Sequence, residues 1–174
     1  MGRPHLLLMG AACLALAGCV ASARTELIVF VDSDLARPDP LSRITLSVRH
    51  ADRELGPFSE VVDPGRANAQ ALPVSLGITN RTVGDDEIEI RATAANRDGE
   101  LVAQRARVRF VPGETRAVCL RLDEACRGVE CGEATCVAGT CVDAHLEAAS
   151  LPTVDAASVE TFSCPRSSHQ EVAP

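Results

Sequence analysis

Residues 25–122 alternate between apolar and polar side chains with a period of two, which is typical of strands that pack one face against a core. The alternation is clearest at 44–49, 88–94 and 105–110, whereas 27–31 is apolar throughout, as in a central strand. The alternation recurs at 72–78 and at 118–122, and a weaker segment at 58–62, an edge strand bounded by Pro57 and Pro64, completes a series of seven. We therefore predict an all-β fold, an antiparallel sandwich of about seven strands in two sheets.

One hairpin of this sandwich can be specified further. Asn96-Arg97-Asp98-Gly99 is a turn sequence between two alternating segments, with Gly99 suited to a left-handed position. The register that follows places Glu89 opposite Arg107 and Glu87 opposite Arg109, and opposite charges across such a pair contribute roughly 0.2–1 kcal/mol. We therefore interpret the arginines of the second strand as a charge-paired face and not as a ligand site: Arg105, Arg107 and Arg109.

The N-terminus has the features of an export signal. Arg3 precedes an apolar run over 6–17, which is shorter than the roughly 20 apolar residues of a membrane span. The run ends in Leu-Ala-Gly-Cys at 16–19, which resembles the lipobox of bacterial lipoproteins. In that family the peptidase cuts before the cysteine, and the cysteine carries the lipid.

This resemblance implies that 1–18 is a cleaved signal peptide, that Cys19 is the lipidation site, and that 19–24 forms a short tether. In the sorting rule of the family, Asp after the lipidated cysteine retains the protein in the inner membrane. Val20 stands there in this chain, so the resemblance implies the outer membrane, with the protein facing the periplasm or the surface. The membrane would be one partner, reached through the lipid.

The cysteines indicate a second structural device. Of eight, Cys13 lies in the signal and Cys19 accepts the lipid, which leaves six, and an even number in an exported chain predicts three disulfides. Four of the six recur with four residues between neighbours, so we predict a small disulfide knot over 123–143, followed by an irregular tail over 144–174. The six predicted disulfide cysteines are Cys119, Cys126, Cys131, Cys136, Cys141 and Cys164.

Among the 15 formal pairings of six cysteines, we favour the crossed pairs Cys126–Cys136 and Cys131–Cys141. Cys119 then pairs with Cys164. The alternation supports that pair, because the neighbours of Cys119 face the core and Cys119 itself points outward, where a tail that crosses the outside of the sheet would meet it.

Metal binding is the less favoured use of these residues. Structural zinc sites prefer pairs of closely spaced cysteines separated by a longer loop, and export favours disulfides. Acidic groups at 32–34 and 85–87 could hold calcium, but Asp at strand ends is an ordinary turn residue. We expect no metal and no other cofactor.

Composition and motifs disfavour several functions. The net charge is −7, and loss of Arg3 with the signal makes it −8, which is unfavourable for nucleic acid binding. The chain lacks Trp and Tyr, which disfavours stacking on sugars or bases, and it lacks lysine, which excludes lysine-based catalysis. No hydrolase, metalloprotease or phosphate-loop motif accompanies the histidines of the mature chain, so we expect no enzyme: His50, His145 and His169.

The order of these segments is similar to a family of small exported proteins of myxobacteria and their relatives. The similarity spans most of 19–151 and is carried by Leu-Ile-Val-Phe-Val-Asp-Ser-Asp-Leu at 27–35, Thr-Arg-Ala-Val-Cys-Leu-Arg-Leu at 115–122 and the cysteine-rich stretch at 125–144. It implies an immunoglobulin-like or transthyretin-like sandwich and a knot of the size of an EGF module. Longer members carry repeats or lectin-like domains after the knot, and we expect none of their activities here.

The sequence therefore predicts a lipid-anchored envelope protein that is a non-enzymatic binding or structural module. Its partner would be an envelope protein that contacts loops at one end of the sandwich. The alternative is a small periplasmic protease inhibitor or enzyme. An inhibitor would need an exposed, rigid loop between paired cysteines, for which 132–135 and 137–140 are the candidates.

Overall fold

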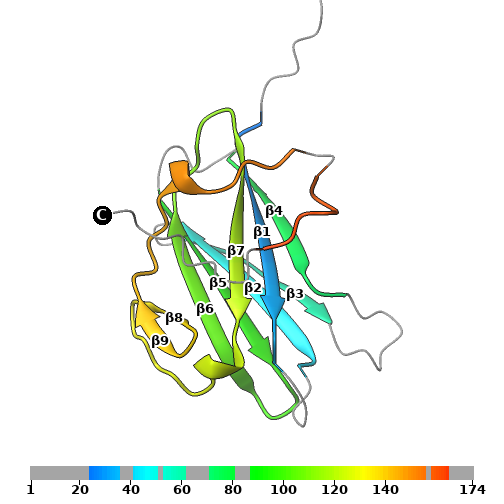
Figure 1. The fold of residues 1–174 in the computed structure, drawn as a ribbon, viewed down its shortest axis with the longest axis vertical. Coiled ribbons are helices and arrows are strands. Elements are labelled where there is room, and N and C mark those ends of the chain that lie inside the picture. Colours follow the sequence, from blue (N-terminus) through cyan, green and yellow to red (C-terminus); the bar gives the residue numbers. More distant parts are fainter. Residues whose placement is uncertain are drawn as a thin grey trace, which may run out of the picture.

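The computed structural model describes residues 24–35, 41–50, 53–61, 71–80, 87–155 and 158–164. In these ranges the chain is all-β, as predicted, with two sheets that pack face to face (Figure 1). The strand order is β4-β1-β7 in one sheet and β3-β2-β5-β6 in the other. The strands are β1 (Glu26–Ser33), β2 (Arg43–His50), β3 (Arg53–Val61), β4 (Val74–Thr79), β5 (Ile88–Ala95), β6 (Glu100–Val108) and β7 (Thr115–Leu122).

The apolar β1 is the central strand of its sheet and is covered on both faces. Leu27, Val29 and Val31 point into the core between the sheets, and each is 0% exposed. Ile28 and Phe30 point to the outer face, where the C-terminal tail packs on them. Burial on both sides explains why the segment has no alternation.

One prediction about the sandwich is wrong: it is not antiparallel throughout. β1 pairs with β7 in parallel, with Glu26 opposite Thr115 and Ser33 opposite Leu122. Parallel neighbours need a long crossover connection, and here the segment from β2 to β6, which includes the whole second sheet, supplies it. The first and last strands of the sandwich are therefore adjacent, which alternation within each strand cannot reveal.

Two strand limits also differ from the expectation. Pro57 lies inside β3 and does not bound it, but β3 is an edge strand as predicted, where a proline is tolerated because its missing N–H can face outward. Leu72 lies before β4 and is 36% exposed, so it does not belong to the buried alternation of that strand.

The predicted hairpin between β5 and β6 forms in the predicted register. Asn96 Oδ1 accepts hydrogen bonds from the backbone N–H groups of Asp98 (2.8 Å) and Gly99 (3.1 Å), and Gly99 has a φ of 140°. In the ladder, Glu89 lies opposite Arg107. The local turn sequence therefore sets the pairing of these two strands.

The ion pairs on the hairpin are not the predicted direct ones. Glu89 lies 3.8 Å from Arg105, diagonally across the ladder, while Arg107 lies 3.7 Å from Glu133, outside the sheet. β6 ends before Arg109, so no Glu87–Arg109 ladder pair forms. Long arginine side chains reach past their direct neighbours to carboxylates on other elements.

After β7 the chain forms a short 3-10 helix, η1 (Glu124–Cys126), and a small hairpin of β8 (Thr135–Val137) and β9 (Thr140–Val142). We call residues 123–143 the cystine module. Figure 1 shows the β8–β9 hairpin, in yellow, beside β6. Cys126 and Cys136 belong to the same buried cluster as the sandwich, so this segment shares the core of the sandwich.

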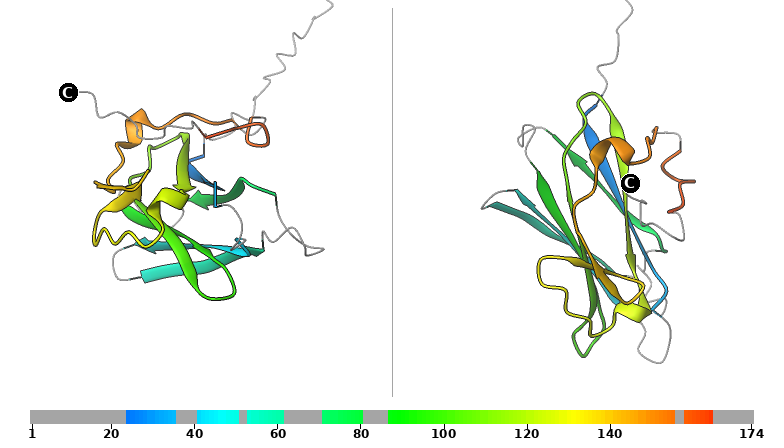
Figure 2. Two further views of the ribbon diagram at one scale, coloured as in Figure 1. Left: turned by 60° about the horizontal axis from the view of Figure 1, so that its bottom comes forward. Right: turned by 60° about the vertical axis from the view of Figure 1, so that its left-hand side comes forward.

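The tail then crosses the outside of the β4-β1-β7 sheet, as the orange segment in Figure 2 shows. It includes a second 3-10 helix, η2 (Ala148–Ser150). Ala117 N–H donates to Pro152 O (2.9 Å), and Val154 N–H donates to Thr115 O (3.0 Å). Phe162 stacks on Phe30 with ring centroids 4.6 Å apart. No helix among the described residues is long and apolar enough to cross a membrane.

Candidate functional site

All six predicted disulfide cysteines are joined in the structure, in the three predicted pairs. Cys126 bonds to Cys136, Cys131 to Cys141, and Cys119 to Cys164. The pairs differ in environment: Cys126 and Cys136 are each 3% exposed, whereas Cys141 is exposed at the surface. Because these sulfur atoms are bonded to one another, they are not thiolate ligands for zinc.

A buried glutamine connects the cystine module to the sandwich. Gln104 is 7% exposed and occupies a core-facing position of β6, between the buried Val102 and Ala106. Its Nε2 donates to Cys136 O (3.3 Å), and its Oε1 accepts a hydrogen bond from the backbone N–H of Arg121 in β7. One side chain therefore joins β6, β7 and β8.

Three further contacts hold the module against β6. Thr135 Oγ1 accepts a hydrogen bond from the backbone N–H of Arg105 (3.0 Å). Arg107 Nη2 donates to Glu133 O (2.7 Å), and the carboxylate of Glu133 lies 3.4 Å from Arg105 Nη1. These contacts join the module to the side of the sandwich along β6.

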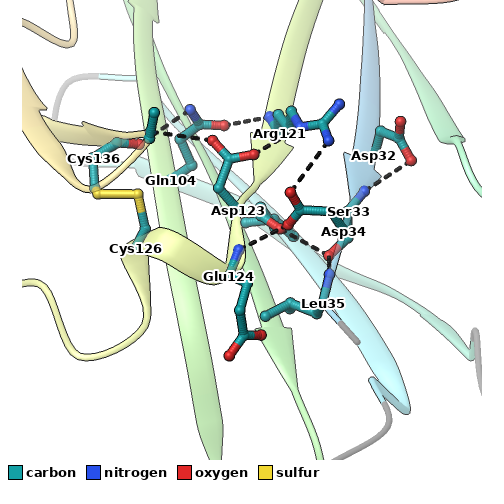
Figure 3. Close-up of polar contacts among 12 residues, drawn as sticks. Asp32, Ser33, Asp34, Leu35, Gln104, Arg121, Asp123, Glu124, Cys126 and Cys136 are labelled. Carbon is teal, nitrogen blue, oxygen red and sulfur yellow. Dashed lines mark hydrogen bonds and ion pairs between the residues drawn. A yellow bond between two sulfur atoms is a disulfide. The ribbon is translucent and has the colours of Figure 1, made fainter. Parts of the chain in front are cut away.

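A cluster of one arginine and two aspartates, Arg121, Asp34 and Asp123, lies at the end of the sandwich where β1 and β7 finish (Figure 3). Arg121 Nε lies 2.7 Å from Asp123 Oδ1, and its Nη2 lies 3.2 Å from Asp34 Oδ2. The hydrogen bonds to Asp123 and then to Asp34 raise the pKa of Arg121 above its ordinary value, because both favour the charged guanidinium.

Both carboxylates of this cluster also accept backbone hydrogen bonds. Asp34 Oδ1 accepts from the N–H of Glu124 (2.8 Å), and Asp123 Oδ2 accepts from the N–H of Ala138 (3.2 Å). Asp34, one of the candidate calcium ligands, therefore orients η1. Among the described residues, no group of three or more His, Cys, Asp or Glu side chains is placed to hold a metal ion; Asp85 and Asp86 lie outside them.

A groove of about 480 Å³ lies between β6 and the cystine module, within the size range of ligand clefts. All six consecutive residues Glu100–Arg105 line one side. Since alternate side chains of a strand point to opposite faces, this lining means that the backbone edge of β6 itself faces the groove. The other wall contains Gly128, Val129 and Cys131, and Val129 is 37% exposed.

The edge of β6 is occupied along only part of its length. Near the C-terminal end of β6, Arg107 N–H donates to Ala144 O (2.7 Å) and Leu146 N–H donates to Arg107 O (2.8 Å). The tail therefore pairs there as a short parallel strand. Arg105 N–H is bound by Thr135. By alternation the N–H and C=O of Ala103 point to the same edge. Within the described ranges, no hydrogen bond from the tail or the cystine module reaches Ala103.

The two histidines that the structure describes, His50 and His145, lie apart from the groove. His145 Nδ1 lies 2.9 Å from Glu87 Oε2, where it ties the start of the tail to β5. His50 ends β2, and His169 lies outside the described residues. Neither of the two described histidines lines the groove.

Both loops proposed for protease inhibition are tight turns. At 137–140, Ala138 and Gly139 have φ angles of 47° and 81° and form the turn between β8 and β9. At 132–135, Ala134 N–H donates to Cys131 O (3.0 Å), and Thr135 is buried. Both loops are thus turns next to β8 or β9, and the protease-inhibitor alternative stays a prediction.

Sequence reasoning missed the groove and the contacts that form it. The one visible signal was Gln104, a polar residue at a core-facing position of an alternating strand.

The predicted lipidation site, Cys19, lies outside the described residues. Comparisons of the chain found no matching protein-family model and no significant match among curated proteins or solved structures.

Proposed function

We propose that this chain is an exported lipoprotein, held at the cell envelope by lipid on Cys19, and that it works as a non-enzymatic binding module. The observation that carries the proposal is the pairing of all six downstream cysteines in three disulfides. Such pairing favours an oxidising compartment, in agreement with the export signal. It also leaves Cys19 as the single cysteine of the mature chain without a disulfide partner, as a lipid acceptor requires.

The position of the groove suits a protein that is anchored to a membrane through its N-terminus and binds a partner on the side away from the lipid. The tether before Arg24 is only a few residues long, so the end of the sandwich where β1 begins would lie near the lipid. The groove-lining half of β6 is its first half, which follows the β5–β6 turn. This turn and the cystine module lie toward the end of the sandwich opposite to the start of β1 (Figure 1). The groove would then face away from the membrane and stay accessible to an envelope partner.

The chemistry of the groove favours binding over catalysis. Its described lining contains no histidine, and its cysteines are in disulfides, so it offers no activated nucleophile of the usual type. Its charged side chains are two arginines and two glutamates: Arg91, Arg105, Glu100 and Glu130. A surface of this kind can hold a ligand by shape and hydrogen bonds.

Mass spectrometry of the protein from membranes of a bacterial host tests this proposal. We expect a mature chain that starts at Cys19, carries acyl chains there and has no free thiol. Two acyl chains on Cys19 are enough to hold the protein stably in the membrane. Cys19→Ser should move the protein out of the membrane fraction, and gradient separation of the two membranes tests the outer-membrane assignment. An unlipidated chain that keeps the same membrane partitioning would refute the anchor.

A further inference from the structure

We propose that the groove between β6 and the cystine module binds an extended, uncharged peptide segment of another protein, which adds to the open edge of β6 as an extra strand. The inference rests on the binding function proposed above and names its ligand class. Strand addition is a general mode of peptide recognition, in which backbone hydrogen bonds supply affinity and side-chain contacts supply specificity.

The edge of β6 has the required backbone geometry. The lining by Glu100–Arg105 exposes the backbone edge, and the outward N–H and C=O of Ala103 are a donor and an acceptor on one residue. Most proteins protect such an edge by charge, proline or a covering segment. Here the cystine module stands beside the edge but leaves a groove of about 480 Å³ between them.

The protein's own tail shows that this edge accepts a strand. Residues 144–146 pair with Arg107 through two backbone hydrogen bonds of 2.7 and 2.8 Å. A peptide at Ala103 would extend the same row of pairing toward the β5–β6 turn. The site therefore lies on the same strand edge as an intramolecular interface of the same kind, with the Arg105–Thr135 hydrogen bond between the two.

Charge and size around the groove indicate an uncharged peptide with small or β-branched side chains. Arg91 Nη2 lies 3.1 Å from Glu100 Oε1, and Arg105 lies between Glu89 and Glu133 at 3.8 and 3.4 Å. These arginines already have carboxylate partners, so a charged peptide gains little and must be desolvated. Of the other polar lining residues, Gln104 and Thr135 are hydrogen-bonded within the protein, and Glu130 is exposed to solvent. The small or apolar lining includes Ala103, Gly128, Val129, Gly132 and Ala134.

The test is selection of random displayed peptides against the full disulfide-bonded chain, purified from whichever cell fraction contains it. We expect uncharged peptides rich in Val, Thr, Ala and Ile to be enriched. A synthetic copy of an enriched peptide should slow hydrogen exchange at the Ala103 amide. This selection does not require lipid on Cys19, so failure of the anchor and failure of the groove are distinguishable.

Three variants locate the binding site. Ala103→Pro removes the outward N–H but no bond of the β5–β6 ladder, and we expect about fivefold weaker peptide binding, as for loss of one hydrogen bond. Val129→Glu puts a charge in the groove and should weaken binding by about tenfold or more. Thr140→Glu, an exposed position of the same module outside the groove, is the matched control and should bind normally.

The outcomes are decisive in both directions. Absence of enriched peptides, enrichment of charged peptides, or equal binding to Ala103→Pro and wild type would each overturn the proposal. Thermal unfolding of every variant shows whether it is folded. If Ala103→Pro does not fold, Val129→Glu against Thr140→Glu decides alone, and equal binding of these two variants refutes the groove.

Discussion

Removal of the disulfide between Cys119 and Cys164, by replacing both with alanine, should destabilise the protein more than removal of either disulfide inside the cystine module. This bond connects the outer face of β7 to the tail that covers Ile28 and Phe30. It joins residues 45 apart, whereas each pair in the module joins residues 10 apart. A cross-link that closes a longer loop removes more entropy from the unfolded chain.

The loop lengths give the magnitudes. Closure of the longer loop is worth about 4 kcal/mol in the chain-entropy relation, and closure of a 10-residue loop about 2.7 kcal/mol. The two crossed disulfides lie inside the longer loop and shorten it in the unfolded state, which lowers the first value by only a few tenths of a kcal/mol because the dependence is logarithmic. The expected difference between the variants is about 1 kcal/mol.

Urea unfolding under non-reducing conditions measures both values. The comparison variant is Cys131→Ala with Cys141→Ala, which removes the more exposed pair of the module. The dependence of the unfolding free energy on urea should steepen in both variants, since an unfolded chain with one cross-link fewer exposes more surface.

Local release of the tail is detected separately. The Val154 amide donates to Thr115 O at 3.0 Å, so its hydrogen exchange reports whether the tail detaches before the sandwich unfolds. A loss below about 1 kcal/mol with Val154 still protected would refute the entropic reasoning. So would a loss smaller than that of the comparison variant.

Two further predictions concern the contacts that hold the cystine module. Thr135→Val keeps the side-chain shape but leaves a backbone N–H of β6 without its acceptor, so it should lower the unfolding free energy by about 1–2 kcal/mol. The exposed control Thr140→Val should change the unfolding free energy by less than about 0.5 kcal/mol. Equal values for the two variants would contradict the assigned hydrogen bond. Arg121→Leu leaves the Asp123 carboxylate, whose side chain is 11% exposed, without its charge partner. We expect a loss of about 2 kcal/mol in urea unfolding, below that of a fully buried pair because Arg121 is 28% exposed, and partial recovery when Asp123→Asn is added. Absence of recovery would show that packing, and not charge, dominates there.

The local parts of the fold were predictable because they depend on neighbours in the sequence. Alternation located most strands, and the Asn-Arg-Asp-Gly turn set the register that places Glu89 opposite Arg107. The parallel pairing of β1 with β7 was not predictable, since strand order depends on contacts between segments far apart in the chain.

The disulfides show both cases. The outward position of Cys119 follows from the parity of its strand, and with the regular spacing of the other four cysteines it led to the pairing that the structure has. Their spacing does not reveal where the knot packs. That depends on Gln104, Thr135 and Glu133, whose hydrogen-bond partners across the module boundary lie 26 to 32 residues away in the sequence, on other elements.

The sequence by itself therefore determined the all-β class and the hairpin register, because each depends on a local pattern of side chains; export and lipidation at Cys19 stay predictions from a local pattern of the same kind. Only the tertiary structure decided the strand order, the double cover of β1 and the groove beside β6. A groove exists where two surfaces approach without closing, and the distance between them results from the packing of the whole core. No short segment of the sequence encodes that distance, so the proposed binding edge at Ala103 emerges only when the chain is folded.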